Sequence, residues 1–283
     1  MPDRKEIKLQ VGTNVIQTGP EYDWYCLSVQ GDEYMEADVS IENYAAGDGG
    51  YIKNIRYQAR YIDIVIRSRL ETSEQIDATE LQLKSYLDSK AESILTIYKN
   101  GVERIGYGRV ADVKKSSKAK WNDKPMVTIT FMMPDPWFVG EERENTFVSA
   151  TPLISFPLSF IADVGLTSGV VVSGNEITFT VGGHDPCGFV LTLTATDAVV
   201  NPKITNADGD YVCVKETLAD NDIIVISTLA RDKYTKLNGV VCRYDRLSEF
   251  FSLEAGSNTL TVSADSGADN LVKSIRWSER YRG

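Results

Sequence analysis

The chain has 283 residues, of which 42% are hydrophobic and 25% are charged, and its formal net charge is −10. This composition is typical of a globular protein, and the length suggests two domains of roughly 140 residues each. Proteins that bind nucleic acid or anionic membranes generally present a basic face, so the acidic balance argues against both functions. No apolar run reaches the ~20 residues of a membrane span, and the polar start lacks the apolar centre of a signal peptide. We therefore expect a protein made and kept in a cytosol.

The four cysteines are Cys26, Cys187, Cys213 and Cys242, and they lie far apart without any CxxC pair. Structural zinc generally requires closer ligand spacing, and a disulfide is uncommon in a reducing compartment. Buried thiols are therefore the expectation, with no metal and no other cofactor.

The first seventy residues predict short strands separated by turns. The glycine-rich stretch YAAGDGGYIKN, residues 44–54, predicts a loop. The stretch RYQARYIDIVIRSR, residues 56–69, alternates in the manner of a strand with one apolar face and one mixed face. The mixed face is a candidate subunit contact, with solvent or the domain's own core as the alternative. Its four candidate interface residues are Tyr57, Tyr61, Asp63 and Arg67.

One helix is predicted over residues 73–90. Thr72 or Ser73 can cap it, and Ile76, Leu83 and Leu87 fall on one face at helical spacing. Glu80 and Lys84 form an i, i+4 pair that we place on the exposed side, and both are further candidate interface residues. A hairpin with its turn at Asn100-Gly101 follows, and then the basic stretch KKSSKAK, which predicts either a solvated loop or contact with an acidic partner.

Halfway along the chain, a β-branched strand runs into FMMPDPWFVG. Pro134 and Pro136 lack amide donors, so the ladder of a sheet cannot continue through them. Trp137 and Phe138 are large apolar side chains that suit packing onto the first domain. We interpret these four residues as an anchored interdomain collar rather than a free hinge, with domains at 1–140 and 141–283.

The second half predicts many short strands punctuated by Gly, Asn and Asp, including turns at Asn206-Ala-Asp-Gly and at Asn238-Gly239. A run of short strands without a helix predicts a β-sandwich or jelly roll. The fold class is therefore mostly β, with a single helix in the N-terminal domain.

Little in the sequence indicates chemistry. His184 is the single histidine and lies near Cys187, but the surrounding glycines and proline favour a turn over a nucleophile pair. The GDGG and ADGD stretches lack the alternating oxygen ligands of a calcium loop. No phosphate-binding or nucleophile-elbow motif is present. We identify no catalytic, cofactor-binding or metal-binding residue.

Several stretches in order resemble the phage distal tail protein (Dit) family of the tail tip of siphophages. In the first half these are RYQARYIDIVIRSR, the helical TSEQIDATELQLKSYL, LTIYKNGVERIGYGRV and VTITFMMPDPWFVG. In the second half they are NPKITNADGDYVCVKETLADNDIIVIST and the closing segment with FFSLEAGSNTL and a final Arg-Tyr. The resemblance covers nearly the whole chain, and the first forty residues match less well.

The resemblance implies a structural protein without enzymatic activity. Members form a homo-hexameric ring through the N-terminal domain, with a galectin-like β-sandwich outside the ring. The ring joins the tail tube protein to the tail-tip or baseplate hub protein and often carries receptor-binding proteins. The implied location is the virion tail tip after synthesis in the bacterial cytoplasm. No sequence-specific nucleic acid or membrane insertion is implied, and DNA can pass through the lumen.

Two other classes of function remain open from sequence alone. A β-sandwich with exposed aromatic residues such as Trp121 or Trp277 could stack on sugars, which would make this a carbohydrate-binding module for host cell-surface glycans. Paired carboxylates of an envelope hydrolase could come from anywhere in the chain, although nothing singles out a pair.

Overall fold

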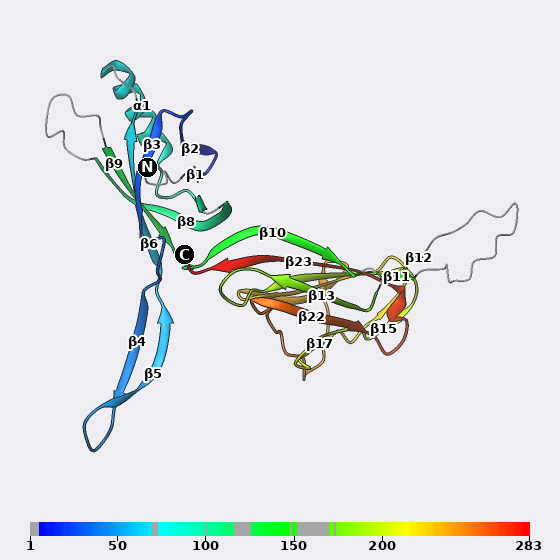
Figure 1. Ribbon diagram of the computed structural model, residues 1–283. Coiled ribbons are helices and arrows are strands. Elements are labelled where there is room, and N and C mark those ends of the chain that lie inside the picture. Colours follow the sequence, from blue (N-terminus) through cyan, green and yellow to red (C-terminus); the bar gives the residue numbers. More distant parts are fainter. Residues whose placement is uncertain are drawn as a thin grey trace, which may run out of the picture. The chain divides into compact units, whose positions relative to one another are not determined.

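The computed structural model describes residues 6–69, 73–99, 101–115, 126–147, 149–151, 170–172 and 174–283. It divides into two compact units. Unit 1 comprises Met1–Glu141 together with Arg280–Gly283, and unit 2 comprises Glu142–Glu279. The chain therefore passes between the units twice, once within strand β10 (Phe138–Thr146) and once within strand β23 (Leu271–Tyr281) (Figure 1).

Unit 1 is built on a closed sheet in the strand order β8-β7-β1-β2-β3-β6-β9, in which β9 pairs back onto β8. Strand β10 also pairs with β8, at Ile105, on the edge opposite β7. The pairs are antiparallel except for a single parallel contact between β2 and β3. Closure leaves few free edges, which protects a sheet from uncontrolled pairing. The strands are β1 (Ile7–Val11), β2 (Asn14–Thr18), β3 (Trp24–Gln30), β6 (Arg60–Ser68), β7 (Ser93–Lys99), β8 (Val102–Lys115), β9 (Met126–Met133) and β10 (Phe138–Thr146).

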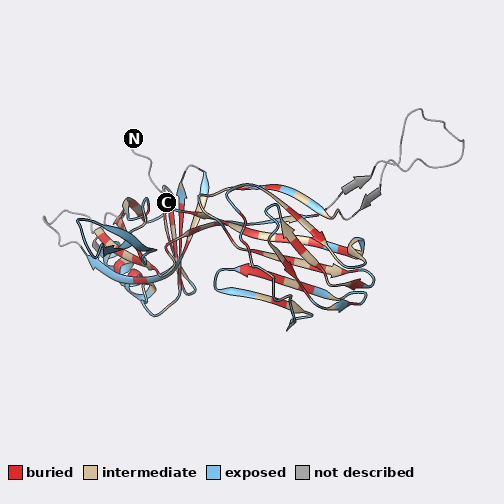
Figure 2. Cartoon of the chain, turned by 90° about the horizontal axis from the view of Figure 1, so that it is seen from below, coloured by how far each residue is buried: buried red, intermediate tan, exposed pale blue. Residues whose placement is uncertain are grey.

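The interior of this barrel comes from the period-two pattern of its strands. In β6, Ile62, Ile64 and Ile66 are each 0–1% exposed, while the side chains between them are half-buried or exposed. The alternation predicted for this strand is confirmed. Strand β9 faces β6 with the same pattern, and its Phe131 and Met133 are fully buried. Figure 2 shows this alternation of buried and exposed positions along the strands.

Helix α1 (Ser73–Tyr86) packs on the barrel through Leu83, which is 5% exposed, with Tyr86 and Leu87 beside it. The predicted helix is confirmed. It ends at Tyr86, short of residue 90, and Leu87 N–H still donates to the Leu83 carbonyl. Thr72 and Asn100 lie outside the described residues, so the predicted cap at Thr72 and the exact turn at Asn100 have no structural account.

A separate two-stranded sheet also belongs to unit 1: β4 (Ala37–Asn43) pairs antiparallel with β5 (Gly50–Tyr57). Two predictions were wrong here. The loop expected over residues 44–54 is shorter, because β5 begins at Gly50. The single strand expected over 56–69 is interrupted at Gln58 and Ala59, where β5 ends and β6 begins. The reason is that Ile52 and Ile55 pair with strand β4 rather than continuing into the barrel.

Unit 2 is a β-sandwich of two main sheets with a shared core. One sheet has the order β21-β20-β19-β14-β23-β10 and the other β13-β22-β16-β17. Phe179, Ile204 and Leu260 from the second sheet pack in one cluster with Leu191 and Ile275 from the first. Its strands are β11 (Ser149–Thr151), β12 (Val170–Val172), β13 (Glu176–Val181), β14 (Phe189–Ala195), β15 (Val199–Val200), β16 (Lys203–Asn206), β17 (Tyr211–Cys213), β18 (Thr217–Leu218), β19 (Ile223–Leu229), β20 (Asp232–Leu237), β21 (Val240–Val241), β22 (Gly256–Ser263) and β23 (Leu271–Tyr281), with the short helix η1 (Ala268–Asn270).

The predicted Asn-Gly turn of unit 2 is confirmed. Asn238 and Gly239 join β20 to β21 with φ angles of 49° and 83°, the two left-handed residues that a tight hairpin turn requires. The Asn238 side chain also accepts from the Ile223 N–H at 2.9 Å and donates to Asp222 at 2.8 Å.

The mostly-β fold class is confirmed, with α1 as the single α-helix among the described residues. Within the described ranges, no helix has the length and apolar character needed to cross a membrane.

Candidate subunit interface

The hairpin β4–β5 carries an apolar face that nothing in its own unit buries. Cross-strand pairing places Val39 opposite Ile55 and Ile41 opposite Ile52, so the four side chains share one face. Their exposed fractions are 43%, 55%, 66% and 59%. Figure 1 shows the hairpin as a two-stranded ribbon separate from the barrel strands. We call these four residues the hairpin apolar face.

The opposite face of the hairpin is polar. Asp38 pairs across the strands with Arg56, and Ser40 pairs with Asn54. Glu42 accepts a hydrogen bond from the Tyr51 hydroxyl at 2.9 Å and lies 3.0 Å from the Lys53 ammonium. The Lys53 ammonium, and then the Tyr51 hydroxyl, hold the pKa of the Glu42 carboxyl below its usual value. A hairpin with one polar and one apolar face is typical of a strand pair that is covered on one side.

An isolated two-stranded hairpin is at best marginally stable in water. A contiguous exposed apolar patch on a rigid element generally marks a protein-protein contact. The hairpin apolar face is therefore the strongest candidate subunit interface among the described residues. The sequence indicated short strands before residue 44 but missed their partner, because the glycines of residues 47–50 suggested a loop. Ile52 and Ile55 are three positions apart and do not alternate; a register shift in the β4–β5 pair brings them to one face.

The predicted interface residues of the mixed strand face do not form one surface. Tyr61 is 57% exposed and Tyr57 is 44% exposed, but the Tyr57 ring meets the Trp137 ring edge-on at 5.6 Å. Asp63 accepts a hydrogen bond from the Thr130 hydroxyl of β9 at 2.6 Å, and Arg67 is half-buried. Tyr61 is thus free to contact a neighbour, whereas Asp63 contributes to the β6–β9 pair.

The expected exposed Glu80–Lys84 pair of the helix is not formed. Glu80 is only 9% exposed and makes an ion pair with Lys115 of β8, while Lys84 is exposed. The prediction that Glu80 lies on the exposed side was wrong, because the long strand β8 brings Lys115 against the helix. The remainder of the predicted basic loop, residues 116–120, lies outside the described residues.

The four collar residues all belong to unit 1. Strand β9 ends at Met133 and β10 begins at Phe138, so Pro134 and Pro136 lie between the strands. Phe138 is 1% exposed within the barrel core, and Trp137 is half-buried. Their role as an interdomain collar stays a prediction.

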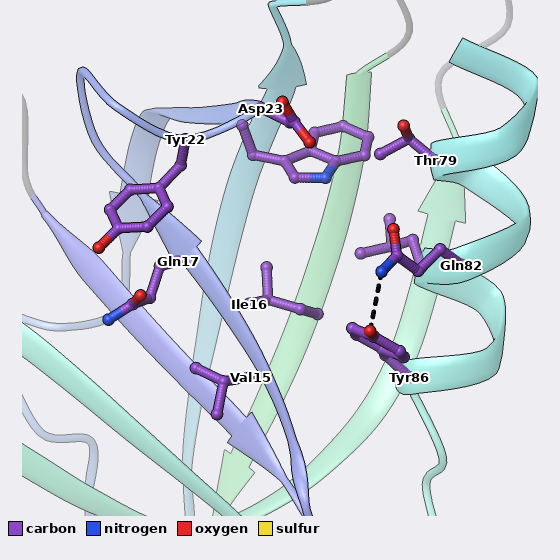
Figure 3. Close-up of a pocket in the computed structure, with 10 residues that line it drawn as sticks. Val15, Ile16, Gln17, Tyr22, Asp23, Thr79, Gln82 and Tyr86 are labelled. Atoms are coloured by element: carbon purple, nitrogen blue, oxygen red, sulfur yellow. Dashed lines mark hydrogen bonds between the residues drawn. The ribbon is translucent and has the colours of Figure 1, made fainter. Parts of the chain in front are cut away.

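A small pocket of about 150 Å³ lies between α1 and the strands β2 and β3 (Figure 3). Tyr22 and Val15 border it with 44% and 41% of their surface exposed, and Gln82 donates to the Tyr86 hydroxyl at 2.8 Å across its helical side. The aromatic and amide lining makes it a recess that one side chain of a neighbouring molecule could fill.

The residues considered for chemistry are poorly placed for it. Cys187, the possible partner of His184, is 1% exposed and therefore inaccessible to a substrate. In the described part of the chain, no group of His, Cys, Asp or Glu has a geometry that could hold a metal ion.

The sugar-stacking role considered for Trp277 is excluded by its position. Trp277 is 5% exposed, and its ring lies 4.6 Å from the Phe179 ring within the sandwich core. A stacking platform requires an open aromatic face. Trp121, the other aromatic residue considered, lies outside the described residues.

A barrel with one helix and a projecting hairpin, followed by a β-sandwich, defines a class of two-unit β proteins, and comparison with known proteins identifies the relatives. Residues 182–281 match the family model of the siphovirus-type tail component, C-terminal domain. No curated protein matches the chain.

Among solved structures, the chain is similar to the Dit protein (gp 19.1) of SPP1, described as a paradigm of the hub adsorption apparatus in phages infecting Gram-positive bacteria. The identity is 12%, the match covers 97% of this chain and 98% of that one, and the TM-score is 0.66. It is also similar to a chain of the phage P2 baseplate in its activated conformation with Ca, with 12% identity, 97% and 98% coverage and a TM-score of 0.50. The chain therefore has the Dit fold, and the resemblance inferred from the sequence is confirmed.

Proposed function

We propose that this chain is the structural distal tail protein of a phage or prophage, located at the virion tail tip. Its hexameric ring joins the tail tube protein to the tail-tip or baseplate hub protein and carries receptor-binding proteins. The match of residues 182–281 to a siphovirus tail component and the Dit fold of the whole chain support this proposal. The N-terminal domain, residues 1–140, forms the ring, and the galectin-like domain, residues 141–283, lies outside it.

The observation that carries the proposal is the exposed hairpin apolar face. A hairpin that reaches from one subunit onto the next makes a heterologous contact, and such contacts generate a closed ring when the rotation between subunits closes. Tyr61, which is 57% exposed, adds an aromatic side chain of the kind enriched in the cores of interfaces. The net charge of −10 is compatible with a lumen that repels DNA phosphates and lets DNA pass.

The test is the mass of the protein in solution by light scattering, with negative-stain images of the particles. We expect the purified native chain to form rings of six copies. We expect the same rings in images of tail tips that contain the protein. The double variant Ile41→Thr/Ile52→Thr keeps β-branched side chains but places hydroxyl groups on the hairpin apolar face, and it should remain monomeric.

The matched control is Ser40→Thr/Asn54→Thr, which alters the cross-strand pair on the polar face of the same hairpin. This control should assemble as the native chain does. Rings that persist in the Ile41→Thr/Ile52→Thr variant would show that the hairpin apolar face does not form the subunit contact. Infectious tails that assemble without this protein would contradict the proposed function as a whole.

A further inference from the structure

We infer that residues 280–283 act as a clasp that completes unit 1, so that the first unit reaches its stable form only after the second unit has been synthesised. These four residues, which we call the clasp, follow the whole of unit 2 in sequence and yet belong to unit 1. The inference concerns folding order, and its link to assembly rests on the proposed function.

The first residue of the clasp binds the segment between β9 and β10. Arg280 makes an ion pair with Asp135 at 3.5 Å, and its guanidinium lies 4.6 Å from the centre of the Trp137 ring. The Arg280 side chain is only 25% exposed, so this contact is more than a solvent-separated surface pair.

The second residue of the clasp is part of the barrel core. Tyr281 is 8% exposed and packs in the same cluster as the isoleucines of β6. The guanidinium of Arg104 from β8 lies 5.0 Å from the centre of the Tyr281 ring. Burial lowers the pKa of Arg104, whereas Tyr281 acts in the opposite direction. Tyr281 therefore covers one side of the half-buried Arg104 guanidinium of strand β8.

The third residue of the clasp, Arg282, provides a hydrogen-bond acceptor for a buried guanidinium. Arg60 of β6 is 4% exposed, donates through Nη2 to the Arg282 carbonyl, and lies 5.0 Å from the Phe138 ring. Its Nε and Nη1 atoms have no hydrogen-bond partner among the described residues. Removing the Arg282 carbonyl would leave a buried guanidinium with still fewer partners, which is costly in a low-dielectric interior.

The last residue of the clasp lies directly against backbone. A Cβ added at Gly283 would overlap the Glu33 carbonyl oxygen and lie 2.8 Å from the Asp32 carbonyl oxygen. Asp32 is itself 3% exposed and acts in favour of the charged forms of both Arg60 and Arg104. Only glycine fits this approach, so the clasp extends from β9–β10 across β6 and β8 to the segment after β3.

The clasp is synthesised well after the rest of unit 1. Arg60 and Arg282 are 222 positions apart, and the residues of unit 2 come between them. At roughly 5–20 residues per second, synthesis of the second unit would delay the clasp by on the order of ten seconds. During that interval unit 1 lacks contacts of the buried Arg60 and of the half-buried Arg104, so its core is not yet complete.

Hydrogen exchange followed by mass spectrometry on the dilute full-length chain tests the inference, because it reports on each unit separately. Tyr281→Ala and Trp277→Ala remove two buried aromatic side chains that lie four residues apart on β23 but in different units. We expect Tyr281→Ala to speed exchange in β6 and β8 by about tenfold or more and to leave β14 unchanged. Trp277→Ala should speed exchange in β14 and leave exchange in β6 and β8 unchanged. Unchanged exchange in β6 and β8 of the Tyr281→Ala variant would overturn the inference.

Gly283→Ala is the second variant, in case Tyr281→Ala does not fold. It removes no side-chain contact, and it should still speed exchange in β6 because the added Cβ overlaps the Glu33 backbone. If β6 of this variant were as protected from hydrogen exchange as β6 of the native chain, the inference that residues 280–283 complete unit 1 would be wrong.

Deletion of residues 280–283 tests the assembly link, and we expect it to prevent ring formation. Rings of normal mass from the deleted chain would overturn that link. A positive exchange result without any rings from the native chain would retain the clasp and reject the proposed function.

Discussion

The two units differ in whether one continuous stretch of the chain completes them. Unit 2 is formed by one continuous stretch, and its sheets share a single apolar core. Unit 1 is discontinuous, holds the buried guanidinium of Arg60, and exposes the hairpin apolar face. Unit 2 also buries a charged side chain, Lys273, and exposes Val240 and Val241, so the clear difference between the units is the continuity of the chain. The sandwich is finished by its own strands, whereas the barrel needs residues 280–283 and, in our proposal, a neighbouring subunit.

The largest expected effects test whether the two cores are independent. Phe189 of β14 and Phe131 of β9 are both 0% exposed, one in each core. Phe189→Ala and Phe131→Ala should each cost about 3–5 kcal/mol in the free energy of unfolding. Calorimetry should show two transitions, each variant lowering the midpoint of its own unit. A single transition that both variants shift equally would contradict the comparison.

A smaller effect is expected where backbone segments approach closely. A Cβ at Gly108 of β8 would overlap the Met132 carbonyl oxygen of β9, where the barrel closes. A Cβ at Gly188 would lie 2.8 Å from the Leu229 Cα in unit 2. Gly108→Ala and Gly188→Ala should each destabilise their unit by about 1–3 kcal/mol, since overpacking forces the backbone to shift.

Urea denaturation, followed by exchange in each unit, measures both glycine variants. Gly108→Ala should affect the barrel alone. If it left the barrel as stable as in the native chain, the closed β8–β9 pairing would be wrong.

The tight turn of unit 2 offers a more local test. Asn238 has a φ of 49°, a conformation that costs alanine roughly 1–2 kcal/mol. Asn238→Ala should therefore lower the stability of unit 2 by about that amount in urea. Asn238→Gly is the control, because glycine accepts the backbone conformation and loses only the bonds to Ile223 and Asp222. Equal losses in both variants would show that the side-chain bonds dominate.

The smallest effect is the pH dependence of one carboxylate in each unit. The pKa of Glu42 is lowered chiefly by Lys53, and the pKa of Asp222 chiefly by the Ala219 N–H and then by Asn238. A carboxyl whose folded pKa lies below its unfolded value adds stability above the unfolded pKa, about 4, and loses that contribution as the pH falls through the folded pKa.

Glu42→Gln and Asp222→Asn should therefore be slightly less stable than the native chain at pH 7. The difference should shrink toward zero near pH 3. Unfolding curves at the two pH values measure it, and a difference that grows on acidification would show the opposite direction of the pKa shift.

The sequence by itself determined the local elements of this protein. Period-two alternation predicted β6, helical spacing predicted α1, and Asn238-Gly239 predicted a tight turn. These features depend on residues close in sequence, where side-chain periodicity and backbone preference act directly. The ordered segments also indicated a resemblance to the Dit family; residues 182–281 match a siphovirus tail-component family model, and the chain has the Dit fold.

Only the tertiary structure decided where charges and apolar faces lie. The sequence predicted that Glu80 is exposed, but Lys115 of β8 pairs with it. It predicted a loop where Ile52 pairs with Ile41. It contained no indication that Tyr281 lies beneath Arg104. Contacts of this kind join residues 11 to more than 170 positions apart, and burial at such separation depends on the path of the whole chain rather than on any local pattern.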